Sequence, residues 1–268
     1  MKIGILGKIT KVKTDDTIEK LVQLLTCAGH ETKRFSTCNE IVDVDVVIVM
    51  GGDGAILHSA VHAAKNGVKI IGINYGNLGF LTELEKDETE KIVAFLSELE
   101  NNTCRIVKRS LLQCEVGGRT FYSLNEVALQ RDYGSPTSPP TQILKVEIAS
   151  REGKERIAGD GILITTPTGS TAYSLSAGGA ILTPEVPVFM MTPICAFSRR
   201  TRPTVFSNDD EFTITVTRGK ALLLIDGLTV AHLPENTQIK IKKAPFTADF
   251  PKRADTDFFE RVRNKLSE

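Results

Sequence analysis

The sequence lacks the features that usually mark a nucleic-acid-binding or membrane protein. Its 33 basic and 33 acidic residues give a formal net charge of zero at pH 7. Bulk electrostatics therefore provides no case for a nucleic acid or an anionic membrane as a partner. No apolar run approaches the roughly 20 residues that a transmembrane helix needs. We expect a protein that binds neither nucleic acid nor membrane.

Cysteine is also scarce, and its spacing is uninformative for metal binding. The chain has five cysteines, an odd number, and none of them forms a CxxC pair. This pattern predicts reduced, mostly buried thiols rather than a disulfide framework. The first seven residues, MKIGILG, are typical of a first strand and too short for a signal peptide. We therefore expect a cytoplasmic location.

The remaining composition indicates a globular protein with two different halves. Hydrophobic residues make up 41% of the 268 residues and charged residues 25%. Residues 1–103 alternate apolar strand patterns with amphipathic helix patterns, which predicts an α/β domain with a parallel sheet. From residue 104 onward, short strands of period-two alternation predict a β-rich domain that ends near residue 251. In the first half, Asp87 is predicted to open a helix. The tail returns to a helical pattern over 255–266, with Phe258, Phe259, Val262 and Leu266 on one face. The Pro-rich segment 134–140 is predicted to be a loop.

One stretch of the first half, residues 46–57, has the sequence VVIVMGGDGAIL. Five apolar residues predict a strand that is buried on both faces, and the apolar residues after the glycines predict a helix. A glycine turn between a strand and a helix N-terminus is a ready phosphate site, because free amides and the helix dipole face the ligand. A second glycine-rich loop, residues 74–80, follows the next strand. It should lie beside the first, since both leave the same edge of a parallel sheet.

Asp53 is unexpected in such a turn, because its carboxylate repels phosphate. It is explained if a metal ion neutralises the site or if Asp53 accepts a proton from a hydroxyl group. The alternative is an ordinary turn in which the aspartate caps the helix. A standard dinucleotide-binding turn is not matched, because Leu57 stands where its third glycine would be and Asn74 stands where an acid would end the next strand. The chain also contains no GxxxxGK[ST] phosphate loop.

Three further features of the sequence carry candidate binding residues. The segment 159–180 is dense in hydroxyl groups and glycines, which suits ribose, base edges and phosphate, or a capped turn. Asn125 and Glu126 interrupt an apolar strand pattern over 121–129, and an inward side chain there needs a polar partner; a solvent-facing position is the alternative. His58 lies one helical turn after Gly54, where it is either near the phosphate turn or an ordinary surface residue. The other three histidines show no metal-ligand spacing.

Four motifs, in this order, are similar to those of the NAD kinase family of bacteria and archaea. They are GGDG at 51–54, Asn125-Glu126, GDG at 159–161, and TPTGSTAYSLSAGG at 166–179. The first motif alone is weak, because diacylglycerol and sphingosine kinases also contain it. The long fourth motif together with the Asn-Glu pair is highly specific.

The resemblance implies a fold, an activity and a set of site residues. It implies a Rossmann-like domain for the phosphate donor (1–103 with 252–268), a β-rich NAD-binding domain (104–251), and a C-terminal helix that packs back on the first domain. It implies that Mg²⁺ or another divalent metal accompanies ATP, that the γ-phosphate passes to the adenosine ribose 2′-hydroxyl of NAD, and that the chain forms a homotetramer. Asp53 is the proton acceptor by this resemblance. The implied substrate-binding residues are Gly54, His58, Asn125, Glu126, Asp160, Thr171, Ala172, Tyr173, Ser174, Leu175 and Ser176.

Two departures and two alternatives accompany this interpretation. The family often has a basic residue where Ala158 stands, and some members place a side chain on substrate where Gly227 stands. Those two contacts are therefore not expected here. The alternatives are another GGDG-type kinase, acting on a lipid or a sugar, and a non-catalytic nucleotide-binding regulator that would need neither Asp53 nor a metal.

Overall fold

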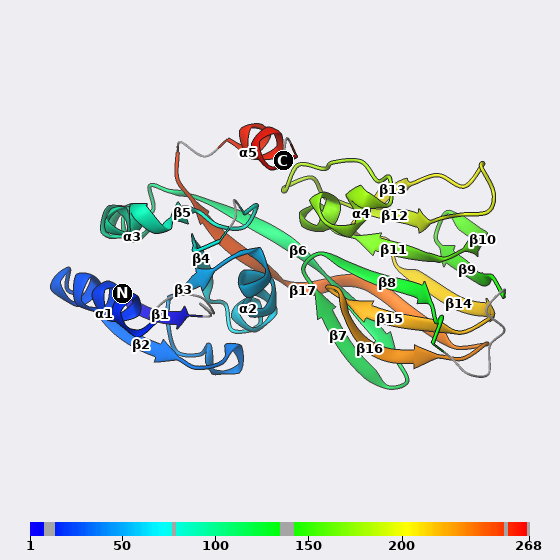
Figure 1. The fold of residues 1–268 in the computed structure, drawn as a ribbon, viewed down its shortest axis with the longest axis horizontal. Helices are drawn as coiled ribbons and strands as arrows, with labels where there is room; N and C mark the ends of the chain where they lie inside the picture. Colours follow the sequence, from blue (N-terminus) through cyan, green and yellow to red (C-terminus); the bar gives the residue numbers. More distant parts are fainter. Residues whose placement is uncertain (8–13, 77–78, 135–141, 255–256, 267–268) are drawn as a thin grey trace. The chain divides into compact units, whose positions relative to one another are not determined.

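The computed structural model describes residues 1–7, 14–76, 79–134, 142–254 and 257–266, which form two compact units (Figure 1). The first unit consists of residues 1–108 and 248–268, and the second consists of residues 109–247. The assignment of residues 1–103 with 252–268 to the phosphate donor, and of residues 104–251 to NAD, stays a prediction. Most of the Pro-rich segment, residues 135–140, lies outside the described residues.

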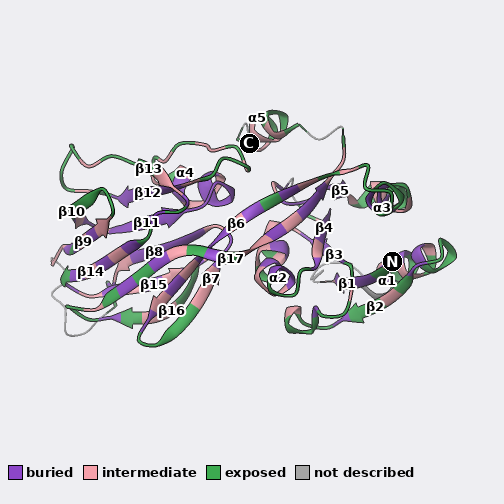
Figure 2. Cartoon of the chain, turned by 180° about the vertical axis from the view of Figure 1, so that it is seen from behind, coloured by how far each residue is buried: buried purple, intermediate pink, exposed green. Residues whose placement is uncertain are grey.

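The first unit is built on a five-stranded sheet with the strand order β2-β1-β3-β4-β5. Every pair in it is parallel, as predicted from the alternating pattern. The strands are β1 (Lys2–Gly7), β2 (Glu31–Phe35), β3 (Val46–Gly51), β4 (Lys69–Asn74) and β5 (Leu84–Glu85). All six residues of the central strand β3 are buried, because helices cover both faces of a parallel sheet (Figure 2).

Helices α1 (Thr14–Cys27), α2 (Asp53–Lys65) and α3 (Ile92–Glu100) bury apolar residues in this unit. The unit also contains α5 (Phe258–Leu266), none of whose described residues is buried, and the short 3₁₀ turns η1 (Cys38–Glu40) and η2 (Lys86–Lys91). Apolar side chains of α1 and α3 share one buried cluster with strands of the sheet. The helix predicted to open at Asp87 is a 3₁₀ turn up to Lys91, and its α-helical part begins only at Ile92. None of the helices in the described part of the chain combines the length and apolar composition that a membrane crossing needs.

The second unit is a sandwich of two six-stranded sheets. The first has the order β10-β9-β14-β17-β6-β7 and the second β13-β12-β11-β8-β15-β16. In the first of these sheets β10, β9, β14 and β17 pair antiparallel in turn, as do β6 and β7, and all neighbours in the second sheet are antiparallel. Apolar residues from both sheets form one buried core, which explains the period-two pattern of the sequence. The bounds are β6 (Arg105–Val116), β7 (Arg119–Ser123), β8 (Glu126–Arg131), β9 (Leu144–Ser150), β10 (Gly153–Gly159), β11 (Gly161–Thr165), β12 (Val188–Ile194), β13 (Thr204–Ser207), β14 (Phe212–Arg218), β15 (Ala221–Ile225), β16 (Leu228–Leu233) and β17 (Gln238–Lys252).

The predicted fold class is confirmed, and three local expectations are corrected. The apolar pattern over 121–129 is not one strand: β7 ends at Ser123, β8 begins at Glu126, and the two belong to different sheets. The cysteines are free, as expected, but only Cys114 is buried. In α5 the expected apolar face is only partly covered: Phe258 and Val262 are half-buried, whereas Phe259 is 57% exposed and Leu266 is 49% exposed. Figure 2 shows no buried residue along this helix.

Candidate active site

The GGDG segment forms the turn between β3 and α2 in the first unit. Gly51 is the last residue of β3, Gly52 is the N-cap of α2, and Asp53 is the first helical residue. Among the described residues, no side chain caps this helix. The alternative in which Asp53 serves as the helix cap is therefore wrong.

The Asp53 carboxylate instead reaches the loop that follows β4. Its Oδ2 accepts a hydrogen bond from the Phe80 amide at 2.8 Å, and its Oδ1 accepts one from the Leu81 amide at 2.9 Å. Its Oδ2 also lies 2.9 Å from the Lys265 ammonium group in α5. Three donors thus fix the orientation of this carboxylate. The predicted proximity of the two glycine-rich loops is confirmed.

Gly79 in the same loop is required by the position of Asp53. A Cβ at residue 79 would collide with Asp53 Oδ1 and would lie 2.9 Å from Thr82 Oγ1. Further back in the loop, Asn74 is buried at the end of β4 and donates to Glu85 at 2.8 Å. Asn74 also accepts a hydrogen bond from the Gly76 amide at 3.0 Å. These two contacts of Asn74 fix the start of the loop and join it to β5.

The start of α2 is open on the side of the glycines. A Cβ built at Gly52 or Gly54 would meet no described heavy atom within 4 Å, apart from chain neighbours and the backbone of the helix itself. Packing within the described residues therefore does not demand glycine at either position, whereas close approach of a ligand to the backbone would. His58, one turn further along α2, is exposed. An exposed helix N-terminus with free amides suits a phosphate group.

In the second unit, Asn125 and Glu126 lie where the chain crosses from β7 to β8. The carboxylate of Asp226, in the turn between β15 and β16, organises this crossing. It accepts hydrogen bonds from the Ser123 hydroxyl and from the amides of Leu124, Asn125 and Glu126, at 2.5 to 3.2 Å. Asp226 has a φ of 48°, in the left-handed region that aspartate tolerates better than most residues. Sequence reasoning missed this role, although an Asp-Gly pair between two strand patterns is a turn signal.

Glu126 is a buried acid without a full set of partners. The residue is 5% exposed, and its Oε2 has no hydrogen-bond partner among the described residues. Burial, together with the nearby Asp226 carboxylate, raises the pKa of Glu126 to about 8. Burial also raises the pKa of Asp226, and the four donors oppose that rise. Glu126 is therefore protonated at neutral pH and can donate or accept a hydrogen bond.

The TPTGST segment lies directly against this crossing. Thr166 donates its hydroxyl to the Leu124 carbonyl at 2.5 Å and its amide to the Asn125 carbonyl at 2.9 Å. A Cβ at Gly169 would collide with the backbone of Asn125, so a glycine is needed there. The segment then forms the 3₁₀ turn η3 (Thr168–Thr171) and the short helix α4 (Tyr173–Ser176). The two motifs of the second unit are thus one packed structure.

The side chains of this segment divide into structural and accessible groups. Ser174 is buried and shares a 2.8 Å hydrogen bond with Thr192, so its role is structural. Thr171, Ala172, Tyr173 and Leu175 are partly exposed and Ser176 is exposed. The Tyr173 hydroxyl accepts a hydrogen bond from Gln130 at 2.7 Å. Beneath the turn, buried Arg109 donates to Thr168 Oγ1 at 3.1 Å, a support that the sequence did not signal.

Asp160 lies at the junction of β10 and β11, between two glycines that close packing demands. A Cβ at Gly159 would lie 2.8 Å from the Ile194 carbonyl, and one at Gly161 would collide with the Leu129 carbonyl. The Asp160 carboxylate is partly exposed and lies 3.5 Å from the Arg131 guanidinium group. The glycines of this motif are structural, and the aspartate between them is accessible.

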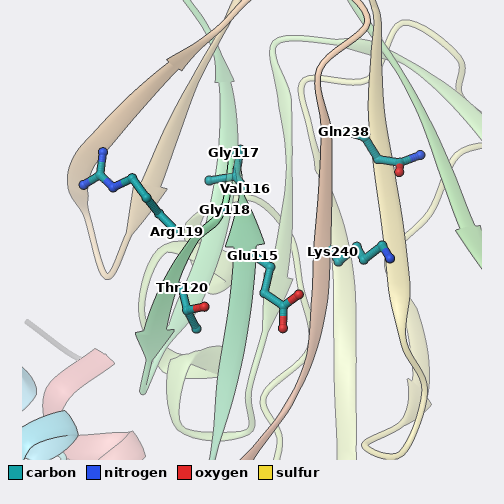
Figure 3. A pocket seen from close by; sticks show the side chains of 8 residues that line it. All are labelled: Glu115, Val116, Gly117, Gly118, Arg119, Thr120, Gln238 and Lys240. Atoms are coloured by element: carbon teal, nitrogen blue, oxygen red, sulfur yellow. The ribbon is translucent and has the colours of Figure 1, made fainter.

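The described residues offer no preformed metal centre. No group of three or more His, Cys, Asp or Glu side chains in the described ranges could hold a metal ion. A depression of about 240 Å³ lies at the β6–β7 turn and is lined by Glu115–Thr120, Gln238 and Lys240. None of the motif residues lines it, and Figure 3 shows Arg119 and Gln238 turned to opposite sides. The candidate residues form two groups, each within its own unit: Asp53, Gly54 and His58 in the first unit, and the other motif residues in the second.

Family models match most of the chain. The model of the ATP-NAD kinase N-terminal domain matches residues 3–101, and that of the C-terminal domain matches residues 124–252. The chain is 32% identical over 284 aligned residues to NAD kinase of Methanothermobacter thermautotrophicus, covering 100% of this chain and 97% of that protein. It is 36% identical to NAD kinase of Bacteroides fragilis, covering 99% and 97%.

Two solved structures share the fold. A yeast NADH kinase complexed with NADH has a TM-score of 0.85 at 21% identity, covering 100% of this chain and 87% of that one. An NAD kinase from Archaeoglobus fulgidus in complex with ATP has a TM-score of 0.78 at 24% identity, covering 100% and 98%. These two structures show the fold. The two matching family models and the curated relatives, together with the four motifs, show that the chain belongs to the NAD kinase family, whose members are enzymes that phosphorylate NAD.

Proposed function

We propose that this enzyme transfers the γ-phosphate of ATP to the 2′-hydroxyl of the adenosine ribose of NAD, giving NADP and ADP. The observation that carries the proposal is the open N-terminus of α2. There, two glycines leave the backbone accessible beside a carboxylate with a fixed orientation. Free amides suit the phosphates of ATP, and an acceptor beside them suits a hydroxyl that must lose its proton.

In the proposed reaction, the ribose 2′-oxygen attacks the γ-phosphorus of ATP. The new bond joins that oxygen to phosphorus, the bond between phosphorus and the β,γ-bridging oxygen breaks, and ADP leaves with the bonding electrons. Asp53 takes the proton of the hydroxyl group. Phosphoryl transfer depends mainly on positioning and on neutralisation of charge, so a rigidly held acceptor suits this chemistry.

The metal ion is proposed to enter with ATP as part of that substrate. Mg²⁺ in kinase sites is commonly held by one or two carboxylates together with substrate phosphates. The charge of such a metal would offset that of the phosphates.

The NAD-binding residues are proposed from the second unit. Asn125 and Glu126 are assigned to the adenosine ribose, and the accessible residues of 171–176 to the adenine. The Glu126 carboxyl group supports this assignment, because a protonated acid whose buried oxygen lacks a partner among the described residues can pair with a sugar hydroxyl. Asp160 is assigned to the nicotinamide end, reached from a neighbouring subunit of a proposed homotetramer.

The test is a coupled assay in which purified protein receives NAD, ATP and Mg²⁺, and NADP is detected by an NADP-specific dehydrogenase. NADP should form, while diacylglycerol and fructose 6-phosphate should not be phosphorylated. Parallel samples with NADH in place of NAD, or polyphosphate in place of ATP, define the substrate range. Phosphorylation of a lipid or sugar without NADP formation would contradict the proposal. Light scattering should give a mass near four times 29.3 kDa.

A further inference from the structure

The C-terminal segment contacts the Asp53 loop through a series of basic residues. Lys252 and the Arg253 amide both bind the carboxylate of Glu83, which is 5% exposed, at 2.5 and 2.7 Å. Within α5, the Arg261 guanidinium group donates to the Thr82 carbonyl. Arg261 and Lys265 are four residues apart, so they lie on one face of the helix. These contacts are made to the same loop whose amides bind Asp53.

Lys265 is the residue of this segment that touches Asp53 itself. Its ammonium group is 2.9 Å from Asp53 Oδ2 and 4.7 Å from the centre of the Phe80 ring. Phe80 also supplies one of the amides that bind Asp53. The side chains of Lys265 and Asp53 are 33% and 29% exposed, so the pair is partly shielded from water.

The geometry leaves one acceptor position on Asp53 for a substrate. An ionised carboxylate can accept about four hydrogen bonds. From the described residues, Oδ2 receives two, from Phe80 and Lys265, whereas Oδ1 receives one, from Leu81. Oδ1 therefore keeps an acceptor position that these residues do not use. The Lys265 cation also offsets the negative charge that makes an aspartate unfavourable beside a phosphate group.

We propose that Lys265 is a positioning residue, which holds the Asp53 carboxylate with Oδ1 free for the ribose hydroxyl and offsets its charge toward the phosphates of ATP. This inference rests on the proposed function, in which Asp53 accepts the hydroxyl proton. It makes the C-terminal helix part of the active site, even though none of the described residues of this helix is buried.

The test compares Lys265→Met, Lys265→Arg and wild-type protein in the NADP-formation assay, with a melting curve for each sample. Loss of one charge-assisted hydrogen bond at a partly exposed site should lower kcat by roughly tenfold. The KM for ATP should rise more than the KM for NAD, because the uncompensated carboxylate repels the phosphates. Lys265→Arg keeps a cation and should retain most of the activity. Lys20→Met, which removes an exposed lysine of α1, is the matched control and should match wild type.

A double mutant separates positioning from a merely structural role. In the Asp53→Asn background there is no carboxylate to hold, so adding Lys265→Met should change kcat by less than about twofold. An equal loss in both backgrounds, or an unchanged kcat for Lys265→Met alone, would overturn the inference. If Lys265→Met unfolds, Lys265→Gln carries the same comparison. A wild-type protein that makes no NADP would overturn the proposed function and this inference together.

Discussion

Replacing Glu126 by glutamine should change how the stability of the protein depends on pH. The folded protein holds the Glu126 proton up to about pH 8, because burial and the neighbouring Asp226 raise its pKa from the ordinary 4.5. The unfolded chain releases the same proton near pH 4.5. Between these values the folded state binds more protons than the unfolded state.

The sign and the size of the effect follow from this difference in bound protons. Rising pH lowers the free energy of unfolding of the wild type, by at most about 1.4 kcal/mol per pH unit for one proton. The stabilising contribution of the Glu126 proton is fully present below about pH 4.5 and is lost as pH rises toward 8. A glutamine side chain cannot ionise, so the variant lacks this loss. The stability of Glu126→Gln minus that of wild type should therefore rise by a few kcal/mol between about pH 5 and pH 8.

Urea unfolding followed by circular dichroism at several pH values measures this difference directly. Glu155→Gln, on the exposed face of β10, is the control and should run parallel to wild type. Parallel curves for Glu126→Gln and wild type would refute the reasoning, because they would mean that Glu126 ionises alike in both states.

Three further predictions concern the loops and the thiols. Gly79→Ala should lower kcat at least roughly tenfold with little change in the KM for NAD, because its Cβ would displace the Asp53 carboxylate; unchanged kinetics would show that the loop adjusts freely. Asp226→Asn should raise the KM for NAD and lower the free energy of unfolding by about 1–3 kcal/mol, since several donors lose a charged acceptor. An unaltered KM would mean that the turn carrying Asp226 does not contribute to NAD binding. A thiol reagent at neutral pH should label exposed Cys195 but not Cys114, whose pKa burial raises to about 12. Mass spectrometry of the labelled peptides measures this, and labelling of Cys114 before Cys195 would contradict the prediction.

The parts of the fold that could be predicted are those whose signal is local. The run Val46–Met50 followed by glycines is a buried parallel strand and a turn, as its composition indicates. The edge strand β2 was not predicted, because only Phe35 of its five residues is buried and its polar sequence carries no strand pattern. The pattern over 121–129 hid a crossing between sheets, since the apolar residues on both sides of Asn125 belong to the same core.

The candidate site was predictable in its motifs but not in its supporting contacts. Glu126 was expected to need a polar partner if its side chain pointed inward, with a solvent-facing position as the alternative. The side chain is buried, and its Oε2 has no hydrogen-bond partner among the described residues. Its neighbour Asp226 is 100 residues away in the sequence, and the Lys265 that contacts Asp53 is 212 residues away. No periodicity or spacing reports such distant pairs. The amphipathic pattern of α5 was misleading for the same reason, because its basic residues and not its phenylalanines make the specific contacts.

The most direct test of the central claim is the kinetics of Asp53→Asn with NAD, ATP and Mg²⁺. The amide keeps the shape of the side chain and loses the proton acceptor. If Asp53 accepts the 2′-hydroxyl proton, kcat should fall by roughly 10²–10⁴-fold, the usual contribution of a positioned acid or base. The KM for NAD should change much less, because the lost interaction exists only in the transition state. A melting curve on the same sample establishes that the variant is folded. A folded Asp53→Asn enzyme with the kcat of wild type would contradict the account.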